Sequence, residues 1–273
     1  MSWLCRAKIA YPFVFPMLKA GVFRGNVVHL HTFKYLSTMK IGIISAMDSE
    51  HRQLADRLQQ KKESGEGRFR YVEGRLGQND VVLTQCGIGK VNAAVGAAEL
   101  IRRHRPDCII STGVAGGIDT VLRVGDVVAS DRLVYHDVYC GNDGTQYGQI
   151  QGMPLYYEAD SSLLHHALDL NNSASLESRI HGGLICTGDR FVEAADELAT
   201  IKGHFPQGLA VDMESAAIAQ TCYIYGVPFL SFRIISDTPG AHDDNFAQYK
   251  DFWATMAERS FQTTWAFLEG VKG

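Results

Sequence analysis

Three carboxylates stand beside apolar segments of the chain, where a charged side chain is costly to bury. Asp237 ends the apolar run 229–235, and Glu50 follows the run 40–47. Glu214 lies in the mostly apolar sequence VDMESAAIAQ. Burial raises the pKa of a carboxyl and keeps it protonated for general-acid work, whereas a helix N-terminus favours the anion that a general base needs. Asp237 and Glu50 are therefore a candidate acid and base.

Each carboxylate also has a structural interpretation. Asp237 could cap the Thr-Pro-Gly turn that follows it, and Glu50 could cap a helix together with Asp48. Glu214 could accept backbone N–H bonds at a helix start, or pair with Arg233, which lies inside an apolar strand and itself needs an acceptor. A sugar diol would also satisfy Glu214, because it offers two O–H donors. Position alone leaves these alternatives open.

Glycine-rich turns and one aromatic residue add to the candidate site. The sequence GVAGG at 113–117 permits close approach of the backbone to a ligand, and Phe191 after CTGDR could either stack on a planar base or pack in the core. The sequence GIGK at 87–90 precedes a helix and resembles an anion site. Neither G-x-x-x-x-G-K-[ST] nor G-x-G-x-x-G occurs in the chain, which argues against an ATPase or a dinucleotide enzyme.

Composition excludes several other classes of protein. The 273 residues are 46% apolar with a net charge of −4, and no basic stripe suggests a nucleic-acid partner. No apolar run reaches the length of a membrane span. The six cysteines are scattered without a C-x-x-C pair, which favours reduced core thiols in a cytoplasmic protein over a metal site.

The first 38 residues differ from the rest of the chain. They contain five Lys or Arg residues and no acid, because the first acidic residue is Asp48. We interpret residues 1–38 as a mis-called start or a disordered leader, with an export or organelle signal as the alternative. No linker or internal repeat divides 39–273, which we expect to form one catalytic domain.

Alternating strand and helix patterns predict an α/β fold with a mixed, twisted central sheet flanked by helices. Strands are expected at 40–47, twice within 68–87, and at 107–117, 125–137, 180–187, 208–211 and 227–237. Helices are expected at 48–60, 87–106, 161–170, 193–203, 212–225 and 246–271, with a loop at 138–160. Ligands in such sheets bind at the carboxyl ends of strands, which is where the candidate residues stand.

Eight motifs occur in a fixed order between Met39 and Trp265: KIGIISAMDSE, GIGKVNAA, STGVAGGID, GDVVASDRLVYHDV, YGQ, CTGDRFV, AVDMESAAIAQ and PFLSFRIISD. Together they resemble the 5′-methylthioadenosine/S-adenosylhomocysteine nucleosidases of the purine nucleoside phosphorylase superfamily. The resemblance implies a single-domain three-layer sandwich and a homodimer. It also implies hydrolysis of an adenine nucleoside without metal or cofactor.

The resemblance also implies a role for each candidate residue. Asp237 would protonate adenine N7, and Glu50 would activate water at the anomeric carbon. Glu214 would hold the ribose hydroxyls, with Met213 packed beneath the sugar. This division is chemically sensible, because cleaving a ribosyl C–N bond needs a neutral acid at the leaving base and an anionic base at the water.

Further residues would shape the pocket around these groups. By the same resemblance, Arg233 would help position the water and Ser236 would orient Asp237. Phe191 would stack on adenine while the Val192 backbone reads its edge. The remaining substrate-binding candidates are Met47, Ala115 and Gly116.

Three departures from the family pattern limit the assignment. Asp212 stands where Glu is commoner, which suggests a capping or supporting role. Val114 replaces a frequent Ser, and the loop that usually shapes the 5′ pocket lacks the aromatic residue expected near Asp143. Methylthio, homocysteinyl, deoxy and futalosine-type substituents therefore all remain open. A phosphate-dependent phosphorylase and a non-catalytic nucleoside-binding protein are the alternative functions.

Overall fold

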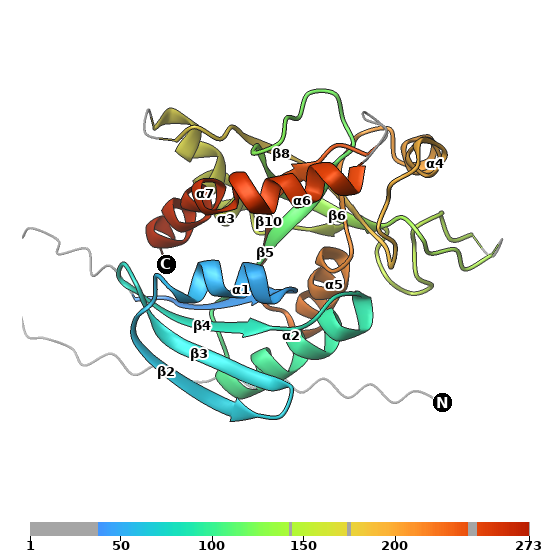
Figure 1. Cartoon of the computed structure of the whole chain (residues 1–273). Helices are drawn as coiled ribbons and strands as arrows, with labels where there is room; N and C mark the ends of the chain where they lie inside the picture. Colours follow the sequence, from blue (N-terminus) through green and yellow to red (C-terminus); the bar gives the residue numbers. More distant parts are fainter. Residues whose placement is uncertain (1–37, 142–143, 174–175, 240–244, 273) are drawn as a thin grey trace, which may run out of the picture. The chain divides into compact units, whose positions relative to one another are not determined.

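Apolar strands alternate with helices along the chain and assemble into one mixed sheet (Figure 1). The computed structural model describes residues 38–272 except 142–143, 174–175 and 240–244, so the expectation for 1–38 lies outside the described residues apart from its last position. The strands are β1 (Lys40–Ser45), β2 (Gln59–Glu66), β3 (Phe69–Leu76), β4 (Asn79–Gln85), β5 (Cys108–Gly117), β6 (Val127–Tyr135), β7 (Tyr157–Glu158), β8 (Ile180–Thr187), β9 (Gly208–Asp212) and β10 (Phe229–Asp237).

The strand order is β10-β6-β8-β9-β5-β1-β4-β3-β2, with β7 beside β6. Strand β5 pairs in parallel with both β1 and β10, and its last two residues pair antiparallel with β9. Five strands therefore close into a ring, while β1 to β4 extend from it. The predicted mixed sheet is confirmed. The ring was not predicted. It depends on which strands pair with each part of the ten-residue β5, and the hydrophobic pattern of the sequence does not specify these pairings.

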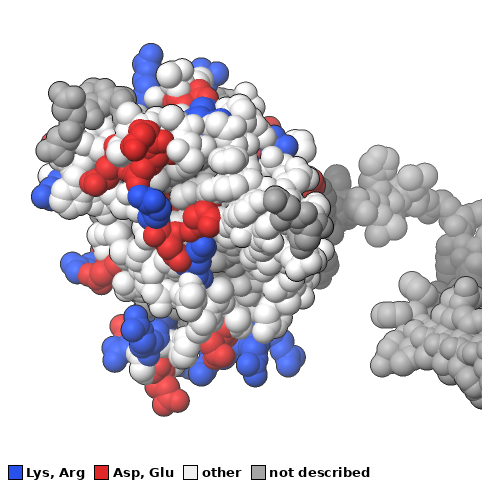
Figure 2. Space-filling view, turned by 90° about the vertical axis from the view of Figure 1, so that its right-hand side faces the viewer, with Lys and Arg blue, Asp and Glu red and all other residues white. Residues whose placement is uncertain are grey.

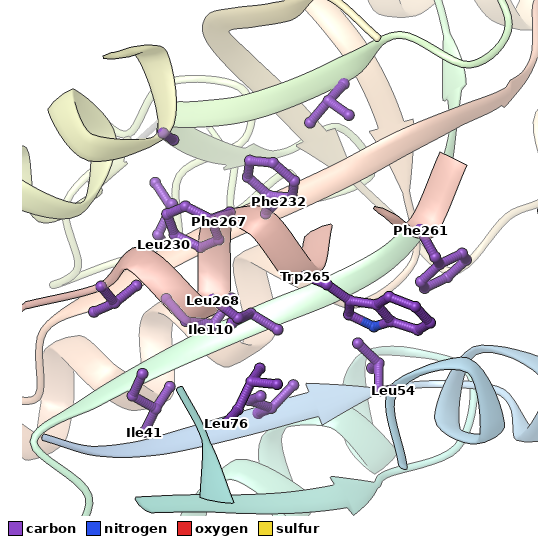
Figure 3. Packing of buried hydrophobic residues seen from close by; sticks show 14 of the residues in the cluster. Ile41, Leu54, Leu76, Ile110, Leu230, Phe232, Phe261, Trp265, Phe267 and Leu268 are labelled. Atoms are coloured by element: carbon purple, nitrogen blue, oxygen red, sulfur yellow. The ribbon is translucent and has the colours of Figure 1, made fainter. Parts of the chain in front are cut away.

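Helices cover both faces of this sheet. They are α1 (Asp48–Ala55), α2 (Lys90–His104), α3 (Ser161–Asp169), α4 (Ala195–His204), α5 (Ser215–Tyr225), α6 (Asn245–Thr255) and α7 (Ala257–Gly270). One core cluster joins α1, α3, α6 and α7 to the sheet, and another joins α2 and α5. Figure 3 shows the first cluster, in which the rings of Phe232 and Phe267 stack 4.6 Å apart. Helices on both faces match the prediction.

The helix expected at 48–60 is shorter than predicted and ends at Ala55. Leu54 and Leu58 are both buried, so the apolar pair was identified correctly, but Leu58 reaches the core from the turn after the helix. Strand β2 was not predicted, since QQKKESGE shows no apolar alternation. Charged side chains of this kind are typical of an edge strand, which they protect against pairing with another chain.

The helix expected at 246–271 is divided at Met256, where φ is −118°. Phe252 of α6 and Phe261 of α7 enter the same core cluster. Residues nine positions apart lie on opposite faces of a continuous α-helix, so the break allows both rings to face one core. The helix expected at 212–225 begins at Ser215, because Asp212 still belongs to β9.

Charge and hydropathy show no extended feature on the described chain. On the face in Figure 2, acidic and basic side chains are interspersed without a continuous basic stripe among the described residues. Within the described ranges, no helix combines the length and hydropathy that crossing a bilayer requires. The described cysteines are free thiols, of which Cys108, Cys186 and Cys222 are buried.

Candidate active site

A cavity of about 240 Å³ opens where β1, β5, β9 and β10 end. It gathers ten of the eleven residues predicted from the sequence: Met47, Glu50, Ala115, Gly116, Phe191, Val192, Met213, Glu214, Ser236 and Asp237. The eleventh, Arg233, is only 1% exposed and stands behind the wall of the cavity beside Glu214. The carboxyl ends of the strands thus converge on one site, as predicted for a sheet of this kind.

Glu50 is buried at the start of α1 and is held by three backbone N–H groups. Its Oε2 accepts bonds from Ala46 at 2.9 Å and Met47 at 3.0 Å, and its Oε1 accepts one from Val114 at 3.0 Å. Glu50 therefore caps the helix, as the structural interpretation expected, while the same carboxyl faces the cavity; Asp48 does not share this role, because its carboxyl pairs with Arg52. Burial raises the pKa of Glu50, and nearby Arg233 together with the three N–H donors opposes that rise.

Asp237 ends β10 with its carboxyl almost fully buried. Ser236 Oγ donates to Oδ1 at 2.6 Å, and Asn245 Nδ2 donates to Oδ2 at 2.9 Å. These bonds replace the turn-capping arrangement that was the alternative interpretation, within the residues that the structure describes. Burial raises the pKa of Asp237, and the two neutral donors oppose the rise.

Arg233 organises the acidic wall of the cavity. Its Nε lies 3.0 Å from Asp212 Oδ2, and its Nη2 lies 3.6 Å from Glu214 Oε2. Burial lowers the pKa of Arg233, but the carboxylates of Asp212, Glu214 and Glu50 outweigh burial and raise it. The guanidinium is therefore a permanent cation that compensates buried acids.

Asp212 has the supporting role suggested for it. Thr187 Oγ1 donates to its Oδ1 at 2.6 Å, and the Ser215 N–H lies 3.2 Å from its Oδ2 at the start of α5. The Ser215 hydroxyl also donates to Asp212 and accepts from Arg233 Nε at 3.1 Å. Asp212 thus caps α5 and fixes the guanidinium that pairs with Glu214.

Glu214 stands at the N-cap position of α5, but its side chain makes no capping bond. Its partners are Arg233 and the N–H of Gly89, the N-cap residue of α2, at 3.0 Å. The ion-pair alternative is therefore confirmed, and the helix start that Glu214 serves is that of α2 rather than that of its own helix α5. Burial raises the pKa of Glu214, and Arg233 opposes this. The N-terminal N–H groups of α2 at GIGK are occupied by carboxylates of the protein itself, since the Lys90 N–H donates to Asp189 at 2.8 Å.

Aromatic side chains line another part of the cavity. Phe191 is 43% exposed, so the core alternative for it is wrong. Its ring meets Tyr249 edge-on at 5.7 Å and Phe246 at 6.1 Å, both from α6. These two residues were not predicted from the sequence, because an aromatic pair at i, i+3 is equally typical of a helix face that packs on a core. Such a group of rings can enclose a planar apolar ligand.

The three departures from the family pattern have different outcomes. Asp212 is explained by its contacts with Arg233 and Ser215. Val114 lines the cavity and serves Glu50 through its backbone N–H rather than its side chain. Asp143 lies outside the described residues. Among those that are described, no group of three His, Cys, Asp or Glu side chains is arranged to hold a metal ion.

Comparison with known proteins places this site in a family. The family model described as "Phosphorylase superfamily" matches residues 40–269. A 5′-methylthioadenosine/S-adenosylhomocysteine nucleosidase from Exiguobacterium sp. is 41% identical, over 86% of this chain and 99% of its own length.

Two solved structures have the same fold and substantial identity. The S-adenosylhomocysteine nucleosidase from Streptococcus pyogenes, in complex with 5-methylthiotubericidin, has a TM-score of 0.80 and 39% identity, covering 87% of this chain and 99% of that one. The 5′-methylthioadenosine/S-adenosylhomocysteine nucleosidase from Colwellia psychrerythraea, in complex with adenine, has a TM-score of 0.82 and 36% identity, covering 88% and 98%. The chain therefore belongs to the 5′-methylthioadenosine/S-adenosylhomocysteine nucleosidase family within the phosphorylase superfamily.

Proposed function

We propose that this protein hydrolyses the N-glycosidic bond of 5′-methylthioadenosine and S-adenosylhomocysteine, releasing adenine and the corresponding thioribose. The observation that carries the proposal is that Glu50 and Asp237 line one cavity and that, although burial raises the pKa of both, different groups oppose the rise at each carboxyl. Glu50 lies near a guanidinium and accepts three N–H bonds, whereas Asp237 is buried against two neutral donors. Surroundings that differ in this way separate a base from an acid.

In the proposed reaction the C–N bond breaks and its electron pair stays with the purine. Asp237 transfers its proton to N7 of the leaving base, so adenine departs neutral. The oxygen of a water molecule bonds to the anomeric carbon and gives its proton to Glu50. A raised pKa makes the Glu50 carboxylate a stronger base once it is ionised. Each proton transfer is expected to contribute roughly 10²- to 10⁴-fold to the rate.

Recognition of the nucleoside is assigned to the remaining lining residues. Glu214 is proposed to accept hydrogen bonds from the ribose hydroxyls. These bonds would help to satisfy its carboxylate, because the residue is only 5% exposed to solvent. Met213 would pack beneath the sugar, and Phe191 would stack on adenine while the Val192 backbone binds its edge. Met47, Ala115 and Gly116 would complete the walls, with Ser236 orienting the acid and Arg233 supporting the water.

Water is favoured over phosphate as the nucleophile because the cavity is acidic. Its lining includes Glu50, Asp212 and Glu214, and Arg190 is the one Lys or Arg among the described lining residues. Arg190 is already paired with Glu197. A phosphate dianion placed beside Glu50 would be repelled, because two negative charges in contact repel each other strongly in a low-dielectric site.

Release of adenine by the purified protein tests this proposal directly. 5′-Methylthioadenosine and S-adenosylhomocysteine should be cleaved equally well with and without phosphate, and the D237N variant should lose roughly 10²- to 10⁴-fold in kcat with a small change in KM. Strict dependence on phosphate would establish a phosphorylase. Tight nucleoside binding without turnover would establish a binding protein. Comparison with 5′-deoxyadenosine and a futalosine-type nucleoside would define the 5′ preference.

We further propose that residues 39–273 form the catalytic domain as a three-layer nucleoside phosphorylase-like sandwich, since the family match spans 40–269 and core clusters lie on both faces of the sheet. A homodimer is proposed by analogy with the family.

A cytoplasmic location is proposed because the buried thiols are unpaired, and burial raises the pKa of Cys186 to about 12, which suits inert core cysteines in a reducing compartment.

A further inference from the structure

Asn245 contacts the carboxyl of Asp237 from outside the cavity. Its Nδ2 donates to Asp237 Oδ2 at 2.9 Å, opposite the bond from Ser236 to Oδ1. Asn245 is the first residue of α6 and is 4% exposed, and it is not among the residues that line the cavity. It therefore acts on Asp237 rather than on a ligand.

A second contact favours one orientation of the Asn245 amide. Nδ2 also lies 3.5 Å from the carbonyl oxygen of Val192, which is an acceptor and requires a donor opposite it. The flipped amide would place its own oxygen against that carbonyl, so the donor orientation is favoured. Asn245 Oδ1 has no hydrogen-bond partner within the described part of the chain. The contacts of the amide are therefore those with Asp237 and Val192.

The chemistry of an amide makes this bond one-directional. An amide NH₂ carries its protons throughout the catalytic cycle and cannot accept one from Asp237, so the acidic proton must lie away from Asn245. When that proton leaves for the purine, Oδ2 becomes part of an anion and the bond to Asn245 becomes charge-assisted and stronger. An interaction that strengthens as the proton moves raises kcat rather than lowering KM.

We propose that Asn245 is a positioning residue that holds Asp237 for proton donation to the leaving purine and stabilises the carboxylate that remains. This role rests on the proposed nucleosidase reaction. It also connects the acid to Val192, so the proton donor and a segment of the cavity wall next to Phe191 are held by one side chain.

Loss of this donor has a consequence for pH dependence. Burial raises the pKa of Asp237, and Ser236 and Asn245 oppose the rise, so removing Asn245 should raise the pKa further. A general acid is lost as pH increases through its pKa, so the alkaline limb of the rate profile should move to higher pH. The other titratable groups that face the cavity are unchanged by this substitution: Glu50, Arg190, Asp212, Glu214 and Tyr249.

The test compares N245L, N245A and the control Q248L. Gln248 lies on the same helix and accepts the Thr238 N–H at 2.8 Å, so Q248L loosens α6 without removing a bond to Asp237. N245L should lower kcat roughly 10- to 100-fold, as expected for a hydrogen bond to a charged group, while KM changes less than about threefold. The alkaline limb of its pH–rate profile should lie at higher pH than that of the wild type. N245A should show the same changes, and it replaces N245L in the test if the leucine variant folds poorly.

Two outcomes would overturn the proposal: N245L or N245A with wild-type kcat, or a loss of kcat with no upward shift of the alkaline limb, as in Q248L. Adenine release by the wild type is measured first, so that failure of this proposal can be distinguished from failure of the proposed function. If the wild type is inactive, carbon-13 NMR of the Asp237 carboxyl, with D237N to assign its signal, measures the titration without catalysis. An unchanged titration in the Asn245 variants would then exclude the role.

Discussion

A methyl group at Gly113 should disturb the placement of Glu50. Gly113 lies on β5 with φ at +149°. A Cβ built there would stand 2.3 Å from Glu50 Oε1 and 2.8 Å from Arg233 Nη1, which is closer than real Cβ atoms approach other heavy atoms. G113A must therefore displace the carboxyl, the guanidinium or the strand itself.

The magnitude follows from the contacts that Glu50 would lose. Its carboxyl is fixed by three N–H bonds of 2.9 to 3.0 Å, and a hydrogen bond to a charged group contributes about 1.5–3 kcal/mol. Loss of one or two such bonds predicts a decrease of about 1.5–6 kcal/mol in the free energy of unfolding. Displacement of the general base should lower kcat by roughly 10²- to 10⁴-fold.

The assays are urea denaturation and steady-state adenine release, with G203A as the matched control. Gly203 lies on α4, and a Cβ there meets no atom within 4 Å. G203A should be neutral or slightly stabilising, by about 0.5–1 kcal/mol, because alanine favours a helix more than glycine does. Both variants make the same chemical change, so a difference between them reports the positive φ of Gly113 together with its close contacts.

A double-mutant cycle identifies the clashing partner. In an E50A background the carboxyl is absent, so G113A should cost less stability than it does in the wild type. Equal costs in both backgrounds, or a G113A enzyme with wild-type kcat, would refute the argument that Gly113 is required for the placement of Glu50.

Three further predictions concern the acidic wall and the base. E214Q should reduce the preference for ribose over 2′-deoxyribose roughly tenfold, measured as the ratio of kcat/KM for the two nucleosides; an unchanged ratio would remove Glu214 from sugar recognition. R233M should cost about 3–5 kcal/mol in urea denaturation, because it leaves buried carboxylates without their cation. That cost should be larger at pH 8 than at pH 5, because without the guanidinium the pKa of Glu214 rises further. A group whose folded pKa exceeds its unfolded pKa loses its stabilising contribution as pH increases through the folded pKa. The acid limb of kcat/KM should lie above 4.5, the ordinary pKa of a glutamate, because burial raises the pKa of Glu50; a limb below 4.5 would exclude Glu50 as the ionising group.

The position of the site could be predicted because its residues interrupt apolar strands. Ser236 and Asp237 end β10, and Met213 and Glu214 directly follow β9. Polar residues at such points have no place in a core, and strand ends converge at one edge of the sheet. The sequence therefore identified the lining of the cavity without any knowledge of how the strands are ordered.

Residues contributed by α6 could not be predicted in the same way. Phe246, Tyr249 and Trp253 recur at helical spacing, which is typical of a helix face that packs on a core. Two of them line the cavity instead, because α6 packs against β10, whose last residues form part of the cavity. Where a helix begins and docks is a tertiary property, so the role of Asn245 was also invisible in the sequence.

The placement of a single guanidinium accounts for the opposite tasks of the two acids. Arg233 stabilises the anionic forms of Glu50 and Glu214 and forms an ion pair with Asp212, all on one side of the cavity. Asp237 receives neutral donors instead, and burial dominates its pKa. Ionised carboxyls beside Arg233 favour the positive charge that develops on the ribose. The cation thus makes the acidic wall possible, while burial keeps the proton on Asp237 until the purine takes it.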